Sequence, residues 1–431
     1  MLDSDAFEIK YKRGMNLKIC MITTRHSLDD ARVVHKEAVS LVRAGHNVFI
    51  ILSCNARYEY VRNDGSIIAR GKAPTGACEY LGIKVFGLPK REGLAGKWKT
   101  FWELSSLAVK LKADVYHAHE PDLSLAIAAR TKKVLRKRGF KVLVIHDMHE
   151  YPPGEPADKC NNLLKMPILL AHVLWNRLSM KWVDHVFTAN NIVRGYALVL
   201  SYKMPVSVLY NGPSLKLFPQ PLRKSWPKKG EKLLLCHEGS IPFNRGLKEM
   251  IEAVNILREK VRLRIVGDVF GKEKEWLDQE ILNKNLQDVI EITGWLSYEK
   301  VSASINDCHA GLIMFRNSIN NRLAGPPNKL FNYMNSGLAV LSVDFPEMKQ
   351  IIEDESCGVL IAGQTVKSII DGIEMLLTDY EKIRIMGENG QKAVRERYSW
   401  GVMEKKMLSD YRKLAMDACR PSHADNEIIN F

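Results

Sequence analysis

The chain alternates short apolar runs with longer amphipathic segments, and this alternation limits the folds open to it. Short apolar strands separated by helices are typical of a parallel sheet covered on both faces. In the first half the apolar runs are Leu17–Ile22, Val48–Leu52, Ile83–Phe86, Val115–Ala118, Val142–Ile145 and Val186–Thr188. In the second half they are Leu233–Cys236, Val261–Val266, Val289–Thr293, Gly311–Met314, Ala339–Val343 and Val359–Ile361. Each half therefore predicts its own doubly wound α/β domain.

The boundary between the two halves is marked by turn-forming residues. The 431 residues exceed one ordinary core and suit two domains of about 200 residues each. Tyr210-Asn211-Gly212-Pro213 and then Pro219-Gln220-Pro221 predict a linker. We therefore expect a first domain over 1–212, a second over 213–399, a last helix over about 400–416 and a tail over 417–431.

Cysteine spacing and hydropathy favour a cytoplasmic protein. The eight cysteines are scattered and form no CxxC pair, so neither a zinc knuckle nor a disulfide framework is expected. The acidic start of the chain, Met1–Asp5, does not resemble a signal peptide. The longest apolar run, Met166–Trp175, is far shorter than the roughly 20 residues of a bilayer span. We expect a protein that is soluble or peripheral on the inner face of the plasma membrane.

The excess of positive over negative charge is confined to the first half. The net charge is +14, and residues 1–220 hold 33 Lys and Arg against 19 Asp and Glu, whereas residues 221–431 hold 30 of each. A one-sided basic domain indicates an anionic partner. Nucleic acid is not expected, since no zinc finger, basic zipper or RNP motif is present.

One segment of the first half suits an anionic membrane surface. A helix that begins near Lys97 would place Trp98, Phe101, Trp102, Ser105 and Val109 on one face, with lysines beside it. The same stripe also suits an ordinary core face. A membrane is therefore one possible partner.

Two turns in the second half carry residues suited to a diphosphate. Gly239–Gly246 follows an apolar strand, and Pro326–Gly337 follows about eighty residues later. Each puts backbone N–H groups and one cation, Arg245 or Lys329, at the start of a helix, where phosphate binds well. The alternative is that both are ordinary surface cations near helix caps.

Further residues near these turns suit a nucleotide. Asn332 lies one turn into the second helix, where its amide could reach a ribose hydroxyl. Gly267 and Gly294 end two further strands, and glycine there lets a base approach the backbone.

Histidines and carboxylates end two strands of the first half. His117 and His119 lie on one face of a strand that runs into Glu120-Pro121, and His146 and His149 flank Asp147 at the end of the next. Such a cluster suits either metal ligation or hydrogen bonds to sugar hydroxyls. We expect His117 and His146 to be core histidines and His119 to be functional. Arg32, near the first helix, would either face the cleft or pair with a nearby carboxylate.

In order and spacing these motifs resemble glycosyltransferase family 4, the retaining sugar-nucleotide transferases of GT-B fold. The resemblance runs from Lys18 to about Tyr411. The version Asp147-Met148-His149-Glu150 is similar to cell-surface polysaccharide transferases. The other matching segments are Asp30-Ala31-Arg32 with Glu37-Ala38, Ala44–Val48, His119-Glu120-Pro121, Gly239-Ser240 with Arg245-Gly246, and Phe331–Met334 through Gly337–Val340.

The resemblance implies two Rossmann-like domains facing a cleft, with the last helix crossing back to the first domain. It implies transfer of a sugar from a nucleotide-diphosphate sugar to a glycan or lipid-linked acceptor, without cofactor or metal. His119, Arg245 and Lys329 would be catalytic. The donor would be bound by Gly239, Ser240, Arg245, Gly267, Pro327, Asn328, Lys329, Leu330 and Asn332. The acceptor side would hold Arg32, Glu120, Asp147, His149 and Glu150.

The donor segment departs from the family pattern. Where the family usually has two glutamates seven residues apart, Ala324 and Asn332 stand here, although branches with a Pro-Asn-Lys turn resemble this chain. Three alternatives therefore stay open. They are a GT-B scaffold without transferase activity, a sugar-nucleotide 2-epimerase, and a metal-dependent hydrolase built on His117, His119, Asp147 and His149.

Overall fold

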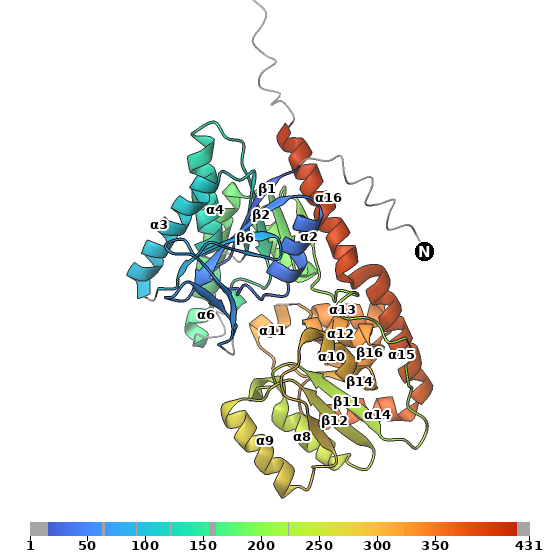
Figure 1. Cartoon of the computed structure of the whole chain (residues 1–431). Helices are drawn as coiled ribbons and strands as arrows, with labels where there is room; N and C mark the ends of the chain where they lie inside the picture. The colour runs from blue at the N-terminus through green and yellow to red at the C-terminus, as the bar shows by residue number, and fades with distance from the viewer. Residues whose placement is uncertain are drawn as a thin grey trace, which may run out of the picture.

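The chain forms two α/β domains, one above the other, and its last helices run beside the second domain and then beside the first (Figure 1). The computed structural model describes residues 16–62, 65–91, 93–119, 123–154, 161–222, 224–323 and 325–419. The predicted fold class, two doubly wound domains, is confirmed.

The first domain is built on an eight-stranded sheet. Its strands, in sheet order, are β10 (Val206–Val208), β9 (His185–Thr188), β8 (Leu143–Met148), β7 (Val115–His119), β1 (Lys18–Ile22), β2 (Asn47–Cys54), β6 (Ile83–Pro89) and β5 (Cys78–Tyr80). All neighbours pair in parallel except β5 with β6. The strand order reverses between β1 and β7, which makes this the crevice where a doubly wound sheet binds ligands.

Alternate residues of these strands feed two cores, one on each face. Cys20 and Ile22 of β1 pack on one face, and Ile19 and Met21 pack on the other. The first face is covered by α3 (Gly93–Leu111), α4 (Leu123–Arg136), α6 (Asn162–Ser179), η2 (Met180–Trp182) and α7 (Asn191–Leu200). The second is covered by η1 (Val33–Ala38), α2 (Val39–Arg43) and the terminal helix α16 (Trp400–Cys419).

The second domain has a six-stranded, fully parallel sheet. Its order is β13 (Ile290–Ile292), β12 (Val261–Val266), β11 (Leu233–Glu238), β14 (Ala310–Ile313), β15 (Ala339–Val343) and β16 (Gly358–Ile361). The reversal lies between β11 and β14. Its helices are η3 (Phe243–Arg245), α8 (Leu247–Ile256), α9 (Gly271–Asn283), α10 (Tyr298–Ile305), α11 (Ile319–Leu323), α12 (Asn328–Asn335), α13 (Pro346–Asp354), α14 (Val366–Thr378), α15 (Tyr380–Ala393) and η4 (Val394–Tyr398).

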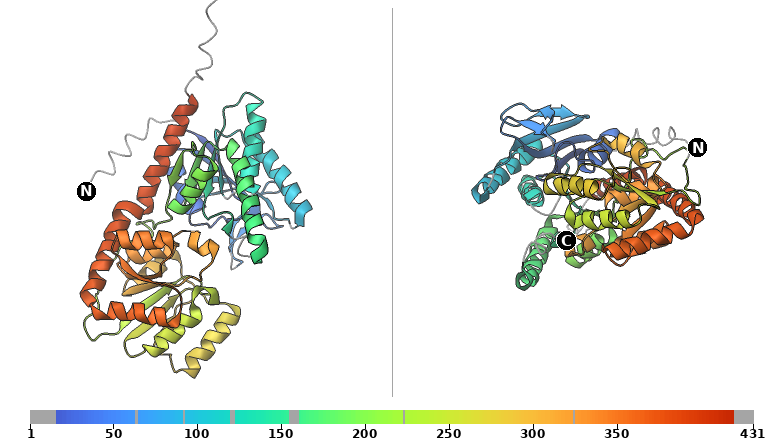
Figure 2. Two further views of the ribbon diagram at one scale, coloured as in Figure 1. Left: turned by 180° about the vertical axis from the view of Figure 1, so that it is seen from behind. Right: turned by 90° about the horizontal axis from the view of Figure 1, so that it is seen from below.

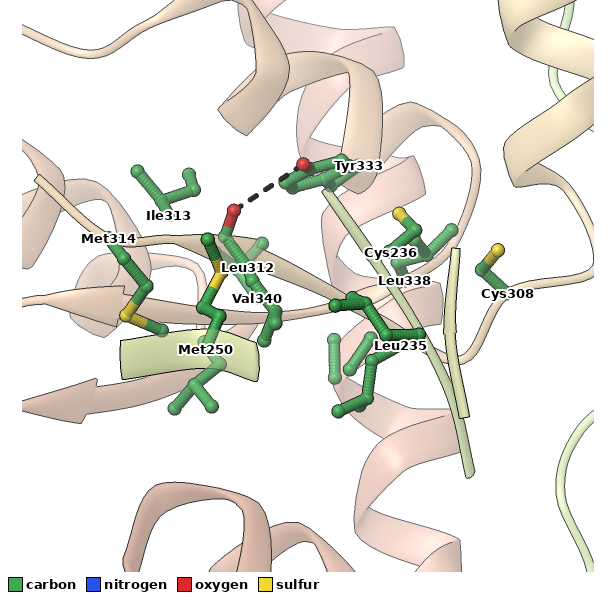
Figure 3. Packing of buried hydrophobic residues seen from close by; sticks show 14 of the residues in the cluster. Leu235, Cys236, Met250, Cys308, Leu312, Ile313, Met314, Tyr333, Leu338 and Val340 are labelled. Carbon is green, nitrogen blue, oxygen red and sulfur yellow. Dashed lines mark hydrogen bonds between the residues drawn. The ribbon is translucent and has the colours of Figure 1, made fainter. Parts of the chain in front are cut away.

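Tyr333 locks α12 onto this sheet (Figure 3). Its hydroxyl donates to the carbonyl of Leu312 at 3.4 Å and accepts from the backbone N–H of Glu238 at 2.8 Å. The ring lies so close to β14 that a Cβ on Gly311 would stand 2.2 Å from it, so only glycine fits there. The helix that carries Lys329 and Asn332 is therefore fixed against β11.

Four strands were not predicted. All twelve apolar runs form strands, and the structure adds β5, β10 and a two-stranded hairpin of β3 (Glu59–Val61) and β4 (Ile67–Arg70). These strands have only three or four residues each, too few for apolar periodicity to mark them.

The apolar face expected on α3 is not continuous. Trp98 and Trp102 are exposed, whereas Ser105 and Val109 are buried. The guanidinium of Arg130, on α4, lies 4.4 Å from the ring centroid of Trp102. Helical spacing alone could not show that the stripe turns from solvent into the core along the helix.

The terminal helix α16 completes the core of the first domain, although it follows the second domain in sequence (Figures 1 and 2). Trp400 is buried, and its Nε1 donates to Oγ of Ser40 at 3.0 Å. Tyr411, also buried, makes a 2.9 Å hydrogen bond to Nδ1 of His117. The first domain is therefore incomplete without the end of the chain.

Replacing Trp400 by alanine should destabilise the first domain selectively. Removing a buried aromatic side chain costs about 3–5 kcal/mol. Hydrogen exchange followed by mass spectrometry should show faster exchange in β1 and β2 and unchanged exchange in β11 and β12. Met416→Ala, at a residue 55% exposed on the same helix, is the matched control and should change neither. Equal acceleration in both sheets would contradict this assignment of α16.

Candidate functional site at the interface of the two domains

The carboxyl ends of both sheets turn toward one interface. Gly154, beyond β8, lies so close to α11 that an added Cβ would meet Oδ1 of Asn320 at 2.9 Å. Similarly, a Cβ on Gly325 would meet the side chain of Asn190, which follows β9. In doubly wound sheets, ligands bind beyond the carboxyl ends of the strands. The predicted site residues of both domains therefore border a common region.

The turn after β11 is shaped by three glycines. Gly239 and Gly246 have φ of +84° and +77°, the left-handed region that favours glycine. A Cβ on Gly267 would stand 3.0 Å from the carbonyl of Gly239, so the end of β12 must also remain bare. Ser240 is exposed, and Gly246 leads directly into α8. The backbone of the turn is thus accessible and continues into the N-terminus of α8, a suitable place for an anion to bind.

Two cations converge on this turn. Lys329, in the first turn of α12, is 6% exposed, and its Nζ donates to Nε2 of His237 at 3.0 Å. Burial lowers the pKa of Lys329 to about 7, with Arg245 lowering it further and Glu238 opposing the shift. Arg245 is exposed, and its guanidinium lies 5.4 Å from the ring centroid of Phe315. A buried ammonium beside a guanidinium is stabilised by an anion between them.

Glu238, the last residue of β11, is a site residue that sequence reasoning missed. The amide of Asn332 donates to its Oε1 at 2.8 Å, so this amide is already engaged by protein. The other oxygen, Oε2, is buried and has no hydrogen-bond partner among the described residues. Burial raises the pKa of Glu238, while Lys329 and Asn332 oppose the shift. An acidic residue at the end of an apolar strand, directly before a glycine turn, was the available signal.

The remaining predicted donor residues follow the start of α12. Pro327 is the residue before the helix, Asn328 is exposed, and Leu330 is fully buried. Leu330 can therefore offer a ligand only its backbone. Ala324 and Glu120 lie outside the described residues.

The acceptor side is organised around a buried guanidinium. Arg32 is 4% exposed and pairs with Asp147 at 2.9 Å and with Glu37 at 2.9 Å, and it also donates to the carbonyl of Leu209 at 2.7 Å. Of the two possibilities left by the sequence, the structure therefore shows pairing. Arg32 and Asp147 are both enclosed, so they act on a ligand through the residues they hold.

His149 and His119 surround the carboxylate of Asp147. Nε2 of His149 lies 2.9 Å from Oδ2 of Asp147, and Nδ1 of His119 lies 3.6 Å from the same oxygen. Nδ1 of His119 and Nε2 of His149 are 3.4 Å apart. Nε2 of His119 is buried and has no hydrogen-bond partner in the described part of the chain.

Burial sets the charges of this cluster. It lowers the pKa of His119 to about 4, although Asp147 opposes the shift, so His119 is neutral at pH 7. Burial alone would raise the pKa of Asp147, but Arg32 holds it well below its usual range. Burial and the neighbouring Asp147 raise the pKa of Glu37 well above its usual value. The pair Arg32–Asp147 is thus ionised, with His119 and Glu37 neutral beside it.

The same cluster does not suit a metal ion. Ligand atoms of Glu37, His117, His119 and Asp147 lie within 4.8 Å of one another. However, the guanidinium of Arg32 already pairs with the ionised Asp147 and contacts Glu37, and a divalent cation beside it would be repelled. The geometry therefore weighs against the metal-dependent hydrolase.

The other residues of the two histidine segments divide into core and surface. His117 and His146 are fully buried, as expected of core histidines. Glu150 is exposed, and its carboxylate raises the pKa of Arg245, against the lowering that burial causes. The carboxylate of Glu150, in the first domain, and the guanidinium of Arg245, in the second, therefore interact electrostatically across the interface.

Glu347 joins the two domains and was also missed. It is 3% exposed in the first turn of α13, yet it caps α7 of the other domain. Its carboxylate accepts from the backbone N–H groups of Asn191 and Ile192 at 2.9 and 3.1 Å, and from the hydroxyl of Tyr210 at 2.8 Å. An acid after proline at a helix start is normally taken to stabilise its own helix, so this contact could not be predicted from the sequence.

Two family models match the chain over most of its length. Residues 31–212 match the glycosyl transferase 4-like domain, and residues 220–393 match glycosyl transferases group 1. The chain belongs to the family 4-like glycosyltransferases. One relative of this glycosyltransferase is an uncharacterised glycosyltransferase of Methanocaldococcus jannaschii, 24% identical over 245 residues. The match covers 55% of this chain and 59% of that protein.

Solved structures confirm the predicted GT-B fold of this glycosyltransferase. Sucrose-phosphate synthase from Thermosynechococcus elongatus has a TM-score of 0.70 at 14% identity, covering 93% of this chain and 99% of that one. The Anabaena protein HepE, solved in complex with UDP-glucose, has a TM-score of 0.65 at 13% identity, covering 92% and 100%. At such identities the likeness shows the fold.

The contact between Asn332 and Glu238 predicts a charge-exchange experiment. Asn332→Glu would place two carboxylates together in a desolvated site, which raises their pKa values and destabilises the fold by about 1–3 kcal/mol at pH 8. At pH 5 the loss should shrink, because one carboxyl can stay protonated. The double variant Glu238→Gln/Asn332→Glu restores one amide and one carboxylate and should recover most of the stability. Urea unfolding followed by tryptophan fluorescence measures this, and a double variant no more stable than the single one would refute the pairing.

Proposed function

We propose that this glycosyltransferase moves a sugar from a nucleoside-diphosphate sugar to an acceptor hydroxyl with retention of the anomeric configuration. The observation that carries the proposal is the convergence of Arg245 and the buried Lys329 on the glycine turn after β11. A buried ammonium with a lowered pKa is costly to keep charged, and a diphosphate offsets that cost by accepting charge-assisted hydrogen bonds.

On the donor side each group has a role that its position supports. Arg245 and Lys329 would neutralise the charge that develops on the leaving diphosphate. The free oxygen of Glu238 would accept from a ribose hydroxyl, in place of the family glutamate that Asn332 replaces. Uridine is the first base to test, because HepE, which shares the fold, was solved with UDP-glucose.

On the acceptor side His119 would hold a hydroxyl of the donor sugar. Its imidazole is neutral, and its Nε2 is the ring nitrogen without a described protein partner. Asp147, held by Arg32, would orient His149 beside it. The acceptor hydroxyl would then attack on the face that the diphosphate leaves, with its proton passing to a departing phosphate oxygen. No metal or cofactor is part of this proposal.

A glycan or lipid-linked acceptor in surface polysaccharide or glycoconjugate synthesis fits this proposal. The segment Asp147–Glu150, similar to cell-surface polysaccharide transferases, and the basic first domain support it. We place the enzyme in the cytoplasm or on the inner face of the plasma membrane. None of the described helices combines the length and the hydropathy needed to cross a membrane.

Two alternatives with the same fold, an inactive scaffold and a 2-epimerase, can be distinguished by experiment. A scaffold without activity would bind a nucleotide diphosphate yet neither transfer nor hydrolyse a donor. A 2-epimerase would convert the donor sugar without any acceptor, which product analysis by NMR reveals. Retention itself is read from the anomeric coupling constant of the product.

Arg245→Ala and Lys329→Ala should each weaken binding of UDP by about 1.5–3 kcal/mol, since each removes a charge-assisted contact to phosphate. Isothermal titration calorimetry measures the change, with thermal unfolding as the check on folding. Lys272→Ala, an exposed lysine at the start of α9, is the matched control and should bind normally. If neither variant loses affinity for UDP or another nucleoside diphosphate that the wild type binds, the assigned site is wrong.

Binding of the diphosphate should take up a proton at pH 8. Free Lys329, with a pKa of about 7, is mostly neutral there, and a phosphate favours the ammonium form and raises the pKa. Affinity should therefore fall as the pH rises above 7. Calorimetry in HEPES and in Tris, whose ionisation enthalpies differ, gives the number of protons taken up. Lys329→Met should abolish the uptake and Arg245→Ala should retain it, whereas equal uptake in Lys329→Met would assign the proton elsewhere.

A further inference from the structure

Helix α6 carries a row of large apolar side chains that nothing in the described chain covers. Each of the seven is at least half exposed: Leu163, Leu164, Met166, Leu170, Leu174, Trp175 and Leu178. Five of them, from Leu163 to Leu178, recur every three or four residues, and Leu164 and Trp175 adjoin members of this series, so the row occupies one side of the helix. Single exposed apolar residues are common on protein surfaces, whereas a contiguous group of this size marks an interaction site.

The opposite side of α6 is attached to the first domain. Asn176 is 2% exposed, and its amide donates to the hydroxyl of Tyr196, on α7, at 3.0 Å. Val173 packs against the core that covers this face of the sheet. The helix is thus docked by one side, and it lies at the periphery of the domain (Figure 2). The exposed row is the free side of an anchored helix.

The Asp, Glu, Lys and Arg side chains of α6 and η2 are all of one sign. Between Asn161 and Val183 the sequence holds Lys165, Arg177 and Lys181 and no aspartate or glutamate. Apolar side chains bordered by cations, with a tryptophan among them, suit a helix that lies in a membrane interface. An anionic leaflet attracts each such cation. A second copy of the chain would bring like charges together, so it complements this face poorly.

We propose that α6 docks the protein on an anionic lipid bilayer, with its apolar row in the headgroup region and the helix axis along the surface. The Trp98 and Trp102 region of α3 is a poorer candidate, because Arg130 stacks on Trp102 and the stripe turns into the core. The proposal therefore assigns docking to the exposed row of α6 and does not require α3.

The benefit of docking rests on the proposed function. Asn162 follows Gly154 by eight positions, and Gly154 lies against Asn320 at the domain interface. Along the sequence, α6 therefore follows soon after the acceptor-side residues Asp147 and His149. A membrane at α6 would bring the head group of a lipid-linked acceptor within reach of the site.

Liposome flotation of the full chain tests the proposal. The protein should float with vesicles of phosphatidylcholine and phosphatidylglycerol in a 7:3 ratio, less with phosphatidylcholine alone, and less in 0.5 M salt. Leu170→Gln/Leu174→Gln/Trp175→Gln should lower the bound fraction at least tenfold. These side chains are all exposed, so folding should persist. The matched control, Val199→Gln/Leu282→Gln/Met375→Gln, changes three exposed apolar residues on other helices and should float like wild type.

Three flotation results would overturn the proposal, and so would one result in light scattering. They are no flotation of the wild type, equal flotation of the α6 variant, and a loss of flotation caused instead by Lys97→Glu/Lys99→Glu on α3 with the α6 variant unaffected. A wild-type dimer in light scattering that the α6 variant converts to a monomer would assign the face to a second copy. UDP binding by the α6 variant should equal that of wild type, which separates failure of docking from failure of the proposed function.

Discussion

One carboxylate, that of Glu347, sets how the two halves of the site face each other. It belongs to the second domain but accepts hydrogen bonds from the first two N–H groups of α7, in the first. A charged acceptor at a helix N-terminus gains both from charge-assisted hydrogen bonds and from the helix dipole. The contact is buried, so water competes little for it. Because the donor-side cations and His119 lie in different domains, their separation depends on this carboxylate, on the close approach of Gly154 to Asn320, and on the chain that passes from η4 into α16.

Within the first domain, Arg32 likewise holds site residues in place, through its contacts with Asp147 and Glu37. A buried guanidinium needs compensation, and Asp147 supplies it as an ionised partner while Glu37 stays neutral. This arrangement leaves the imidazole of His119 without a positive charge. The acceptor half of the site thus reaches electrical balance within the protein, and its hydrogen-bonding groups are oriented before any ligand arrives.

The sequence predicted those features that local pattern determines. Apolar runs marked twelve strands, and glycines before helices marked the turn at Gly239, because backbone conformation and strand burial depend on neighbouring residues. Contacts between distant residues were not predictable in this way. Glu347 meets Asn191 across 156 positions, and Glu238 meets Asn332 across 94. In both pairs the residue type is compatible with an ordinary local role, so only the folded geometry distinguishes the two.

Amphipathic spacing was the least reliable guide, because it shows that a helix has an apolar side and not where that side points. On α3 the expected face divides between solvent and core, whereas on α6 a run too short to span a bilayer stands in solvent. The apolar side of α6 could turn outward because Asn176, a polar residue, supplies its anchor to the domain.

The two halves of the site differ in how their charges are balanced, and this difference orders the events of binding. The donor half holds two cations whose mutual repulsion is relieved only in part by Glu238, so an anion that enters there stabilises the second domain. The acceptor half is already balanced by Arg32 and Asp147 and gains no comparable electrostatic energy from a neutral sugar hydroxyl. We therefore expect a bound diphosphate to contribute most of the binding free energy and an acceptor to contribute less. A nucleotide sugar would bind first, and its anchored diphosphate would place the transferred sugar against His119 before the acceptor arrives.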